Sequence, residues 1–459
     1  MVRSVCFALA LVLVSPHPIH AAWGEVDPAF ATGGWMNPSW PGDFGPSPGA
    51  LTTDSADRIV MAVNTGTSTV RFLRTSDTGT VDSSFGFLGS VSLTVPGAST
   101  ARIVRLLPGV GNGLIAVGDA ELTDGRWIVV FQLYEDGSLA DKFGIDGFAF
   151  TRGGVTGVEA FAADAALNGA MNDQLEVVGW VEHQALARDL GLRAIIDLGD
   201  GGTLAETTIS AVPSVGERWL RIADSGSGQS CHAVLAERDG ALLVFGYSGP
   251  ASPTCGAPSF TLPLSLPAAP SATLRASGLV RAPNGDFVVA AWVESGLLTK
   301  PTAYFRTVGA AAVLRSTWGN SGIAYVDAAS TGWVGFEASR LLADGWTGDI
   351  LSVGSELGTG GLFGTVHRVR AARLLAANGA LDPSVPLSGA VSSDSNRHHR
   401  VRDVAIVAGT GRPAAAVSTH LTDGFDVPKS WLVGLQNASD LFCDGFETAT
   451  TGAWSLTAP

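Results

Sequence analysis

The sequence predicts an all-β protein, a β-propeller of seven four-stranded blades. One observation is composition: 58 of 459 residues are Gly, and only 15% are charged. Abundant Gly together with Val, Thr, Ser and Ala favours short strands joined by tight turns over helices. The other two observations are a Gly-containing turn motif and a polar marker before an apolar strand, both of which recur along the chain.

The strand pattern is clearest in residues 125–150. Apolar side chains fall on both faces from residue 127 to residue 134, which is typical of a strand that is covered on two sides. Asp136-Gly137 then ends the strand, because this pair supplies the positive φ angle that a hairpin turn needs. A short second strand can begin after Phe143-Gly144.

The turn motif keeps a constant spacing. A Gly precedes an aromatic or apolar residue by six positions, and a second Gly follows that residue by four. The motif occurs as Gly24, Phe30 and Gly34; Gly79, Phe85 and Gly89; Gly137, Phe143 and Gly147; and Gly379, Val385 and Gly389.

The polar marker gives the number of repeats. It occurs seven times, at residues 57–61, 112–116, 173–177, 239–243, 284–288, 348–352 and 411–415. A spacing of about 60 residues indicates a solenoid, propeller or array. Each unit has room for four strands, one before the marker, one at it, a long one and a short one after the turn, which is the content of a propeller blade.

These repeats resemble the delta-60 repeat of bacterial secreted and surface proteins. The motif G-x-L-D-x-x-F-G-x-x-G is most intact at residues 81–89 and 139–147, and it is worn at residues 206–274. The resemblance covers the chain to about residue 437 and implies a β-propeller in an exported protein. It implies no catalytic residues.

The chain divides into three parts. Residues 1–22 have the charged start, short apolar run and small residues of a signal peptide. Residues 23–437 form the propeller of delta-60-like repeats. Residues 438–459 form a tail that is similar to the D-G-F-E-x-G-x-x-x-x-W segment of exported gram-negative proteins, with Asp444, Phe446 and Trp454 retained. The tail is either a sorting signal or a segment that packs on the last blade.

Charge and hydropathy limit the partners. The formal charge of −14 disfavours nucleic acid, because an acidic surface repels phosphates. No later apolar run reaches the roughly 18 residues of a membrane span. We therefore expect a secreted, extracellular or cell-surface monomer, with the periplasm as an alternative, and an unknown extracellular protein or glycan as its partner.

The cysteines predict one disulfide. Cys231 and Cys255 flank one predicted hairpin, and an exported protein can form a disulfide between them. The state of Cys443 stays open. None of the spacings fits a zinc site.

No motif identifies catalytic, cofactor-binding or metal-binding residues. The segment 197–202 is read as a turn, with a calcium loop as the alternative. The segment 396–402 contains two His residues and is read as a solvated loop, with a metal site as the alternative.

Tryptophans are the candidate ligand contacts. Trp40, Trp333 and Trp346 lie in loose contexts and could contact a sugar. Four others lie in strand patterns and are predicted to be core residues: Trp127, Trp180, Trp292 and Trp431.

The unit boundaries predict how the ring closes. Residues 24–38 carry a turn motif with no strands ahead of it, while the seventh unit, residues 400–436, lacks a fourth strand. We expect Trp35 and its neighbours to pair antiparallel with residues 431–435, because both open edges are then covered.

The leading functional interpretation is a secreted or surface-associated propeller that acts as a non-enzymatic binding module for a protein or glycan. Two alternatives stay open: a polysaccharide hydrolase or lyase on a propeller scaffold, and a structural envelope or adhesin component. Three or more carboxylates or histidines converging on the axial channel would favour the enzyme, whereas a channel lined by Ser, Ala and Gly would count against it.

Overall fold

The computed structural model of the protein describes residues 27–37, 47–154, 158–168, 173–183, 186–210, 215–223, 233–246, 260–295, 299–309, 311–327, 333–344, 347–360, 364–382, 397–407, 413–421 and 429–435. In these residues it has 27 strands and one short 3-10 turn, η1 (Val110–Asn112). No helix in this part of the chain is long and apolar enough to span a bilayer.

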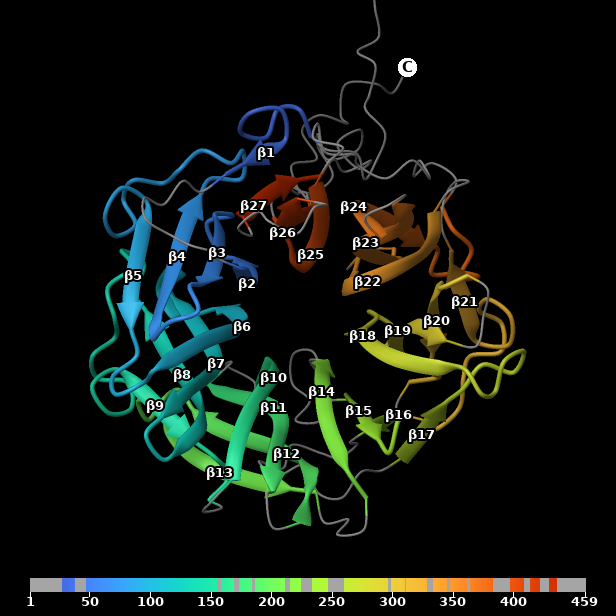
Figure 1. Ribbon diagram of the computed structural model, residues 1–459, viewed down its shortest axis with the longest axis horizontal. Helices are drawn as coiled ribbons and strands as arrows, with labels where there is room; N and C mark the ends of the chain where they lie inside the picture. The colour runs from blue at the N-terminus through green and yellow to red at the C-terminus, as the bar shows by residue number, and fades with distance from the viewer. Residues whose placement is uncertain are drawn as a thin grey trace, which may run out of the picture.

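The strands form seven antiparallel sheets arranged as blades around a central axis (Figure 1). Blade 1 is β2 (Ser47–Thr53), β3 (Ile59–Asn64), β4 (Thr69–Thr75) and β5 (Ser90–Thr94). Blade 2 is β6 (Thr100–Pro108), β7 (Leu114–Leu122), β8 (Gly125–Leu133) and β9 (Phe148–Thr151). Blade 3 is β10 (Val158–Asn168), β11 (Gln174–His183), β12 (Arg188–Asp197) and β13 (Thr203–Ile209). Blade 4 is β14 (Glu217–Ala223), β15 (Ala233–Arg238), β16 (Ala241–Gly246) and β17 (Phe260–Leu264). Blade 5 is β18 (Thr273–Arg281), β19 (Phe287–Ser295), β20 (Thr302–Arg306) and β21 (Ile323–Val326). Blade 6 is β22 (Trp333–Ala343), β23 (Ile350–Gly360) and β24 (Gly364–Leu374). Blade 7 is β25 (Arg397–Ile406), β26 (Pro413–Leu421), β27 (Lys429–Gly434) and β1 (Trp35–Met36).

The predicted seven-bladed propeller is confirmed. Six sheets have four strands, and blade 6 has three within the described residues. The worn region at residues 206–274 contains a complete blade, β14 to β17. The reading of residues 396–402 as a loop is wrong from Arg397 onward, because β25 begins there and pairs with β26.

The hydrophobic core lies between the blades. Buried side chains form seven clusters, and each cluster joins two neighbouring blades. Between blades 1 and 2, for example, Phe72 and Phe85 pack with Ile103 and Phe131. Because both faces of a blade are covered by its neighbours, the strands are apolar on both faces, as the sequence pattern predicted.

The ring closes as predicted. Strand β1 pairs antiparallel with β27 as the outermost strand of blade 7, with Trp35 opposite Val433 and Met36 opposite Leu432 (Figure 1). Asp27 N also donates a hydrogen bond to Gly434 O at 2.9 Å. The outer edge of β27, which would otherwise be open, is thereby covered by β1.

The turn motif is a contact between consecutive blades. The aromatic residue is buried against the first Gly of the next motif, where a Cβ would lie 3.0 Å or less from the ring. The Phe-Gly turn also donates a backbone hydrogen bond to the next turn, as from Gly86 N to Asp136 O at 2.7 Å. There are four such aromatic–glycine pairs: Phe30 with Gly79, Phe85 with Gly137, Phe143 with Gly202, and Trp318 with Gly379. Gly202 lies in a unit that keeps only the turn, and Trp318 lies in one that keeps the second half of the motif, with Gly319 and Gly322.

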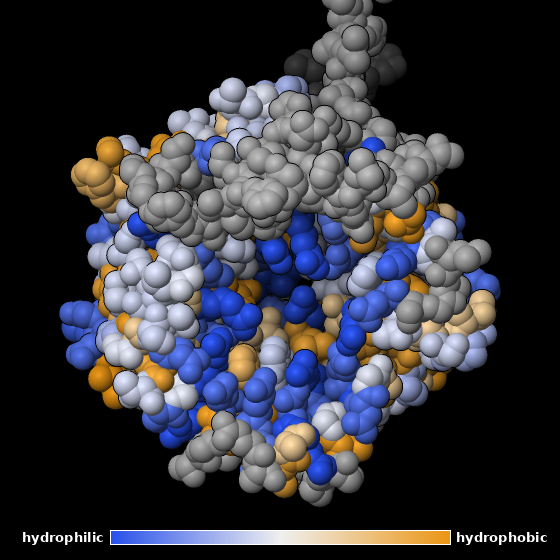
Figure 2. Space-filling view, in the orientation of Figure 1, coloured by the Kyte–Doolittle hydropathy of each residue, from blue (hydrophilic) through white to orange (hydrophobic). Residues whose placement is uncertain are grey.

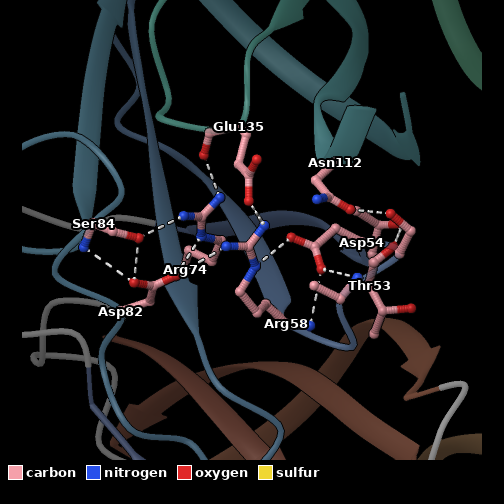
Figure 3. Close-up of polar contacts among 11 residues, drawn as sticks. Thr53, Asp54, Arg58, Arg74, Asp82, Ser84, Asn112 and Glu135 are labelled. Atoms are coloured by element: carbon pink, nitrogen blue, oxygen red, sulfur yellow. Dashed lines mark hydrogen bonds and ion pairs between the residues drawn. The ribbon is translucent and has the colours of Figure 1, made fainter. Parts of the chain in front are cut away.

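The Asp of the motif holds an Arg on the preceding strand (Figure 3). Arg74 Nε donates to Asp82 Oδ2 at 2.8 Å, and its guanidinium lies 4.6 Å from the centroid of the Phe85 ring. In blade 2 the two equivalent positions are Gln132 and Ala140, so both members of the pair are replaced together. The Arg–Asp pair is therefore absent from blade 2, where Phe143 is buried without it.

Candidate functional site in the axial cavity

Every innermost strand has a β-bulge at an equivalent position. The seven innermost strands are β2, β6, β10, β14, β18, β22 and β25, and they surround the axis (Figure 1). A bulge inserts one residue into a strand and redirects the side chains around it, and bulges are common beside active sites. The inserted residues are Gly49, Val104, Ala163, Leu220, Ser277, Ser339 and Arg402.

The residue that follows each bulge is the next one to pair with the second strand. Five of the seven are charged. In blade order these residues are Ala50, Arg105, Asp164, Arg221, Gly278, Arg340 and Asp403. We call the five charged residues the axial cluster. It contains three arginines and two aspartates.

The ion pairs of the axial cluster are long. Arg105 lies 3.5 Å from Asp164 and 3.9 Å from Asp403, measured from nitrogen to oxygen. Arg340 lies 3.5 Å from the same Asp164 and 3.7 Å from the same Asp403. N–H···O hydrogen bonds are normally 2.7–3.2 Å long, so these contacts are ionic attractions more than close hydrogen bonds.

The two aspartates are already bound by the backbone. Asp403 Oδ2 accepts a hydrogen bond from Leu51 N of blade 1 at 2.9 Å, which ties the last blade to the first. Asp164 Oδ2 accepts one from Ile222 N of blade 4 at 3.4 Å. Burial alone would raise the pKa of Asp164, but the positive charges of Arg340, Arg105 and Arg221 outweigh it and lower that pKa. Asp164 is therefore ionised at neutral pH.

The arginines are less well compensated. Burial, together with the like charge of Arg340, lowers the pKa of the Arg105 guanidinium to about 10. Burial also lowers the pKa of Arg221, despite attraction from Asp164. Arg340 has a raised pKa because the two aspartates more than offset its burial. Arg105 Nε is buried without a hydrogen-bond partner among the described residues.

A cavity of about 260 Å³ opens beside the axial cluster. Figure 2 shows the hollow at the centre of the ring, with mainly hydrophilic residues around it. The volume is slightly below the 300–1,000 Å³ that is usual for small-molecule sites. The lining residues are Ser47, Pro48, Gly49, Asn64, Arg102, Ile103, Val104, Ala163, Arg221, Ser339, Arg340, Arg402 and Asp403.

The lining meets neither criterion set from the sequence. Four arginines and one aspartate line the cavity, so it is not a surface of Ser, Ala and Gly. The axial cluster adds a second aspartate, Asp164. Two carboxylates are fewer than the three carboxylates or histidines that would favour an enzyme. No group of three or more His, Cys, Asp or Glu residues suited to a metal occurs in the described part of the chain.

Several sequence-predicted site residues lie outside this region. Cys231, Cys255, Trp40 and Trp346 lie outside the described residues, and so do the segments expected to be a signal peptide and a C-terminal tail. Trp333 is the first residue of β22, and its side chain is not described. The segment 197–202 is a turn in which Gly202 N donates to Asp197 O at 2.8 Å.

The prediction of four core tryptophans is wrong. All four lie in strands, but each is only half-buried; they are Trp127, Trp180, Trp292 and Trp431. Trp127 Nε1 donates to Asp124 Oδ1 at 2.9 Å, whereas Trp180 Nε1 and Trp292 Nε1 are buried. The fully enclosed tryptophans are Trp318 and Trp219, with exposures of 0% and 5%.

The axial cluster is not part of any pattern identified in the sequence. Its members lie in first strands that carry other charged residues as well, such as Arg102 in β6 and Arg400 in β25. Arg105 and Asp403 belong to neither the turn motif nor the polar marker.

No protein-family model matches the chain, and no curated protein matches it. Among solved structures, the polysaccharide lyase Uly1 is 10% identical, with a TM-score of 0.49 over 87% of this chain and 92% of that chain. The α-L-arabinanase of Penicillium chrysogenum in complex with arabinobiose is 10% identical, with a TM-score of 0.44 over 87% and 97%. The NanB sialidase of Streptococcus pneumoniae is 9% identical, with a TM-score of 0.42 over 88% and 71%. At these identities the likeness concerns the fold, and no activity is transferred from it.

Proposed function

We propose that this protein is a secreted or surface-associated β-propeller that binds a glycan or protein at its axial cavity without catalysing a reaction. The observation that carries the proposal is the axial cluster, in which five blades each place one charged side chain at the same bulged position. A rigid ring that positions charged groups around a cavity is suited to recognition. The delta-60 resemblance and the exported location belong to the same proposal.

The axial cluster favours binding over hydrolysis. A glycosidase needs one carboxylic acid with a raised pKa to protonate the leaving group. The pKa of Asp164 is lowered instead, because burial is outweighed by the charges of Arg340 and Arg105. Asp403 is engaged by Leu51 N and Val404 N, both at 2.9 Å. These contacts suit a positioning role for both carboxylates.

A glycan array on the purified chain lacking residues 1–22 tests this proposal. The wild type is compared with Arg340→Gln, which alters the cavity, and with Arg152→Gln, which removes an equal charge after the outer strand β9. We expect binding to a subset of glycans that is lost in Arg340→Gln and kept in Arg152→Gln. Equal binding by all three proteins, or no binding, would contradict the axial site.

Incubating the bound polysaccharide with the wild type addresses the enzymatic alternative. We expect no new reducing ends and no unsaturated sugar ends. Release of either product, absent in Arg340→Gln, would replace the binding module with a hydrolase or lyase. Deleting residues 441–459 tests the structural alternative, since release of an otherwise cell-bound protein would indicate attachment through the tail.

A further inference from the structure

We propose, building on the proposed function, that the axial cavity recognises the carboxylate of an acidic sugar, a uronate of an extracellular polysaccharide. Arg340 and Arg221, which line the cavity, would hold the carboxylate, and the remaining lining would contact the sugar ring. The argument depends on charge, on hydrogen-bonding capacity and on the size of the cavity.

The cavity has the opposite charge to the rest of the molecule. The chain carries a formal charge of −14, yet the axial cluster has three arginines against two aspartates. A further arginine, Arg402, lines the cavity and donates from Nε to Ser418 Oγ at 3.0 Å, a neutral partner. An acidic protein that gathers positive charge at one recess provides a local attraction for an anion.

The arginines have more donors than the aspartates can accept. Three guanidiniums carry about fifteen N–H donors, while two carboxylates offer about eight acceptor sites. Four backbone N–H groups already donate to those carboxylates; they belong to Ala165, Ile222, Leu51 and Val404. Arg221 donates to two carbonyl groups, Ser277 O and Leu220 O.

Arg105 shows this excess directly. Its Nε is buried without a hydrogen-bond partner among the described residues, and its nearest aspartate contacts are 3.5 and 3.9 Å long. Arg105 does not line the cavity, but an anion held by its neighbour Arg340 would add negative charge close to it. The lowered pKa of Arg105, caused by burial and by Arg340, agrees with a missing negative charge.

The size and lining of the cavity favour a sugar acid. At about 30 Å³ per water, the cavity of about 260 Å³ has the volume of roughly nine waters. This is large for a lone carboxylate and suits a small ring that carries one. Val104 offers an apolar contact for C–H groups, while Ser47 and Ser339 offer hydroxyls. Arginine is the side chain that best matches a planar carboxylate, because its guanidinium can donate two parallel hydrogen bonds.

Isothermal titration calorimetry with four probes tests the inference: glucuronate, glucose, acetate and inorganic phosphate. We expect glucuronate to bind more tightly than the other three. Glucose lacks the carboxylate, acetate lacks the ring, and phosphate is an oxyanion of different shape. Arg340→Gln and Arg221→Gln should each weaken glucuronate binding by roughly 10- to 100-fold, the range for a hydrogen bond to a charged group. Arg152→Gln should bind as the wild type does.

The outcomes separate the inference from the proposed function. Equal binding of glucose and glucuronate, both lost in Arg340→Gln, would overturn the uronate and keep the axial binding site. Equal binding of acetate or phosphate would make the cavity a general anion site and overturn the sugar. No binding of any probe, with an array signal that depends on Arg340, would overturn the uronate alone. A melting temperature of each variant close to that of the wild type shows that the loss is not due to unfolding.

Discussion

Replacing Gly137 with Ala tests the contact between consecutive repeats. Gly137 has a φ of +86°, and a Cβ there would lie 2.5 Å from Val91 Cγ2 and 3.0 Å from Phe85 Cε2. Gly240 is a matched control, since its φ is +80° and a Cβ there would meet nothing within 4 Å. Both substitutions carry the same backbone penalty, and only Gly137→Ala adds a clash with the neighbouring blade.

The two penalties can be separated by magnitude. A non-Gly residue with this backbone conformation costs about 1–2 kcal/mol. Forcing an extra methyl group into a packed core costs a further 1–3 kcal/mol or so, because Phe85 has an exposure of 0% and little room to move. The smaller entropy of the unfolded Ala chain, about 0.4–1 kcal/mol, is common to both variants and cancels in the comparison.

Thermal unfolding of the two variants measures the difference. An unfolding entropy of about 2.1 cal/mol/K per residue gives about 0.9 kcal/mol/K for a propeller of about 415 residues. Gly137→Ala should therefore melt about 1–3 °C below Gly240→Ala. Equal melting temperatures would refute the claim that the aromatic–glycine contact holds neighbouring blades together.

Three further predictions concern closure, acid stability and the disulfide. Deleting residues 23–37 removes β1 and the buried Phe30, so the whole propeller should melt far below the wild type; a deletion variant with the wild-type melting temperature would place the closure elsewhere. Burial alone would raise the pKa of Asp286, but hydrogen bonds from Arg315 and other donors outweigh it and lower this pKa from 3.8 to about 2. The stability that Asp286 contributes is therefore complete above about pH 4 and is lost as the pH falls toward 2. In acid unfolding curves, the free energy of unfolding of Asp286→Asn should fall less steeply with pH than that of the wild type. Equal slopes would count against the contribution of Asp286. Reducing the expected Cys231–Cys255 disulfide should lower the free energy of unfolding by roughly 3 kcal/mol, and two freely alkylated thiols in the folded, non-reduced protein would show that the bond is absent.

The blades were predictable because their signals are local. The strand that ends at Asp136-Gly137 and the short strand after Phe143-Gly144 are adjacent in the sequence, so one segment predicts both. The same pattern recurs along the chain, which predicts the other blades. Closure by Trp35 was predictable from counting strands, since the first unit lacked early strands and the last lacked a late one.

The axial cluster was not predictable in the same way. Arg105 and Asp403 belong to blades 2 and 7 and meet only because the ring closes. Their strands also carry Arg102 and Arg400, so the charge of Arg105 or Asp403 does not stand out in the sequence. The bulges that bring these residues to one level of the axis are shifts in strand pairing, and a period-two pattern does not reveal them.

The prediction about tryptophans failed for a related reason. A strand pattern assigns Trp127 or Trp292 to a face of a blade, but it does not say how far the face is covered. Trp318 is buried because its position in the turn motif places it against Gly379 of the next blade. In this protein, a position in the turn motif predicts burial of an aromatic residue better than a position in a strand pattern does.

The most direct measurement is a crystal structure of the protein soaked with glucuronate. The account predicts a sugar ring in the axial cavity, with its carboxylate within hydrogen-bond distance of the Arg340 and Arg221 guanidiniums. A sugar bound on the outer surface, or a ring in the cavity whose carboxylate points away from both arginines, would contradict it.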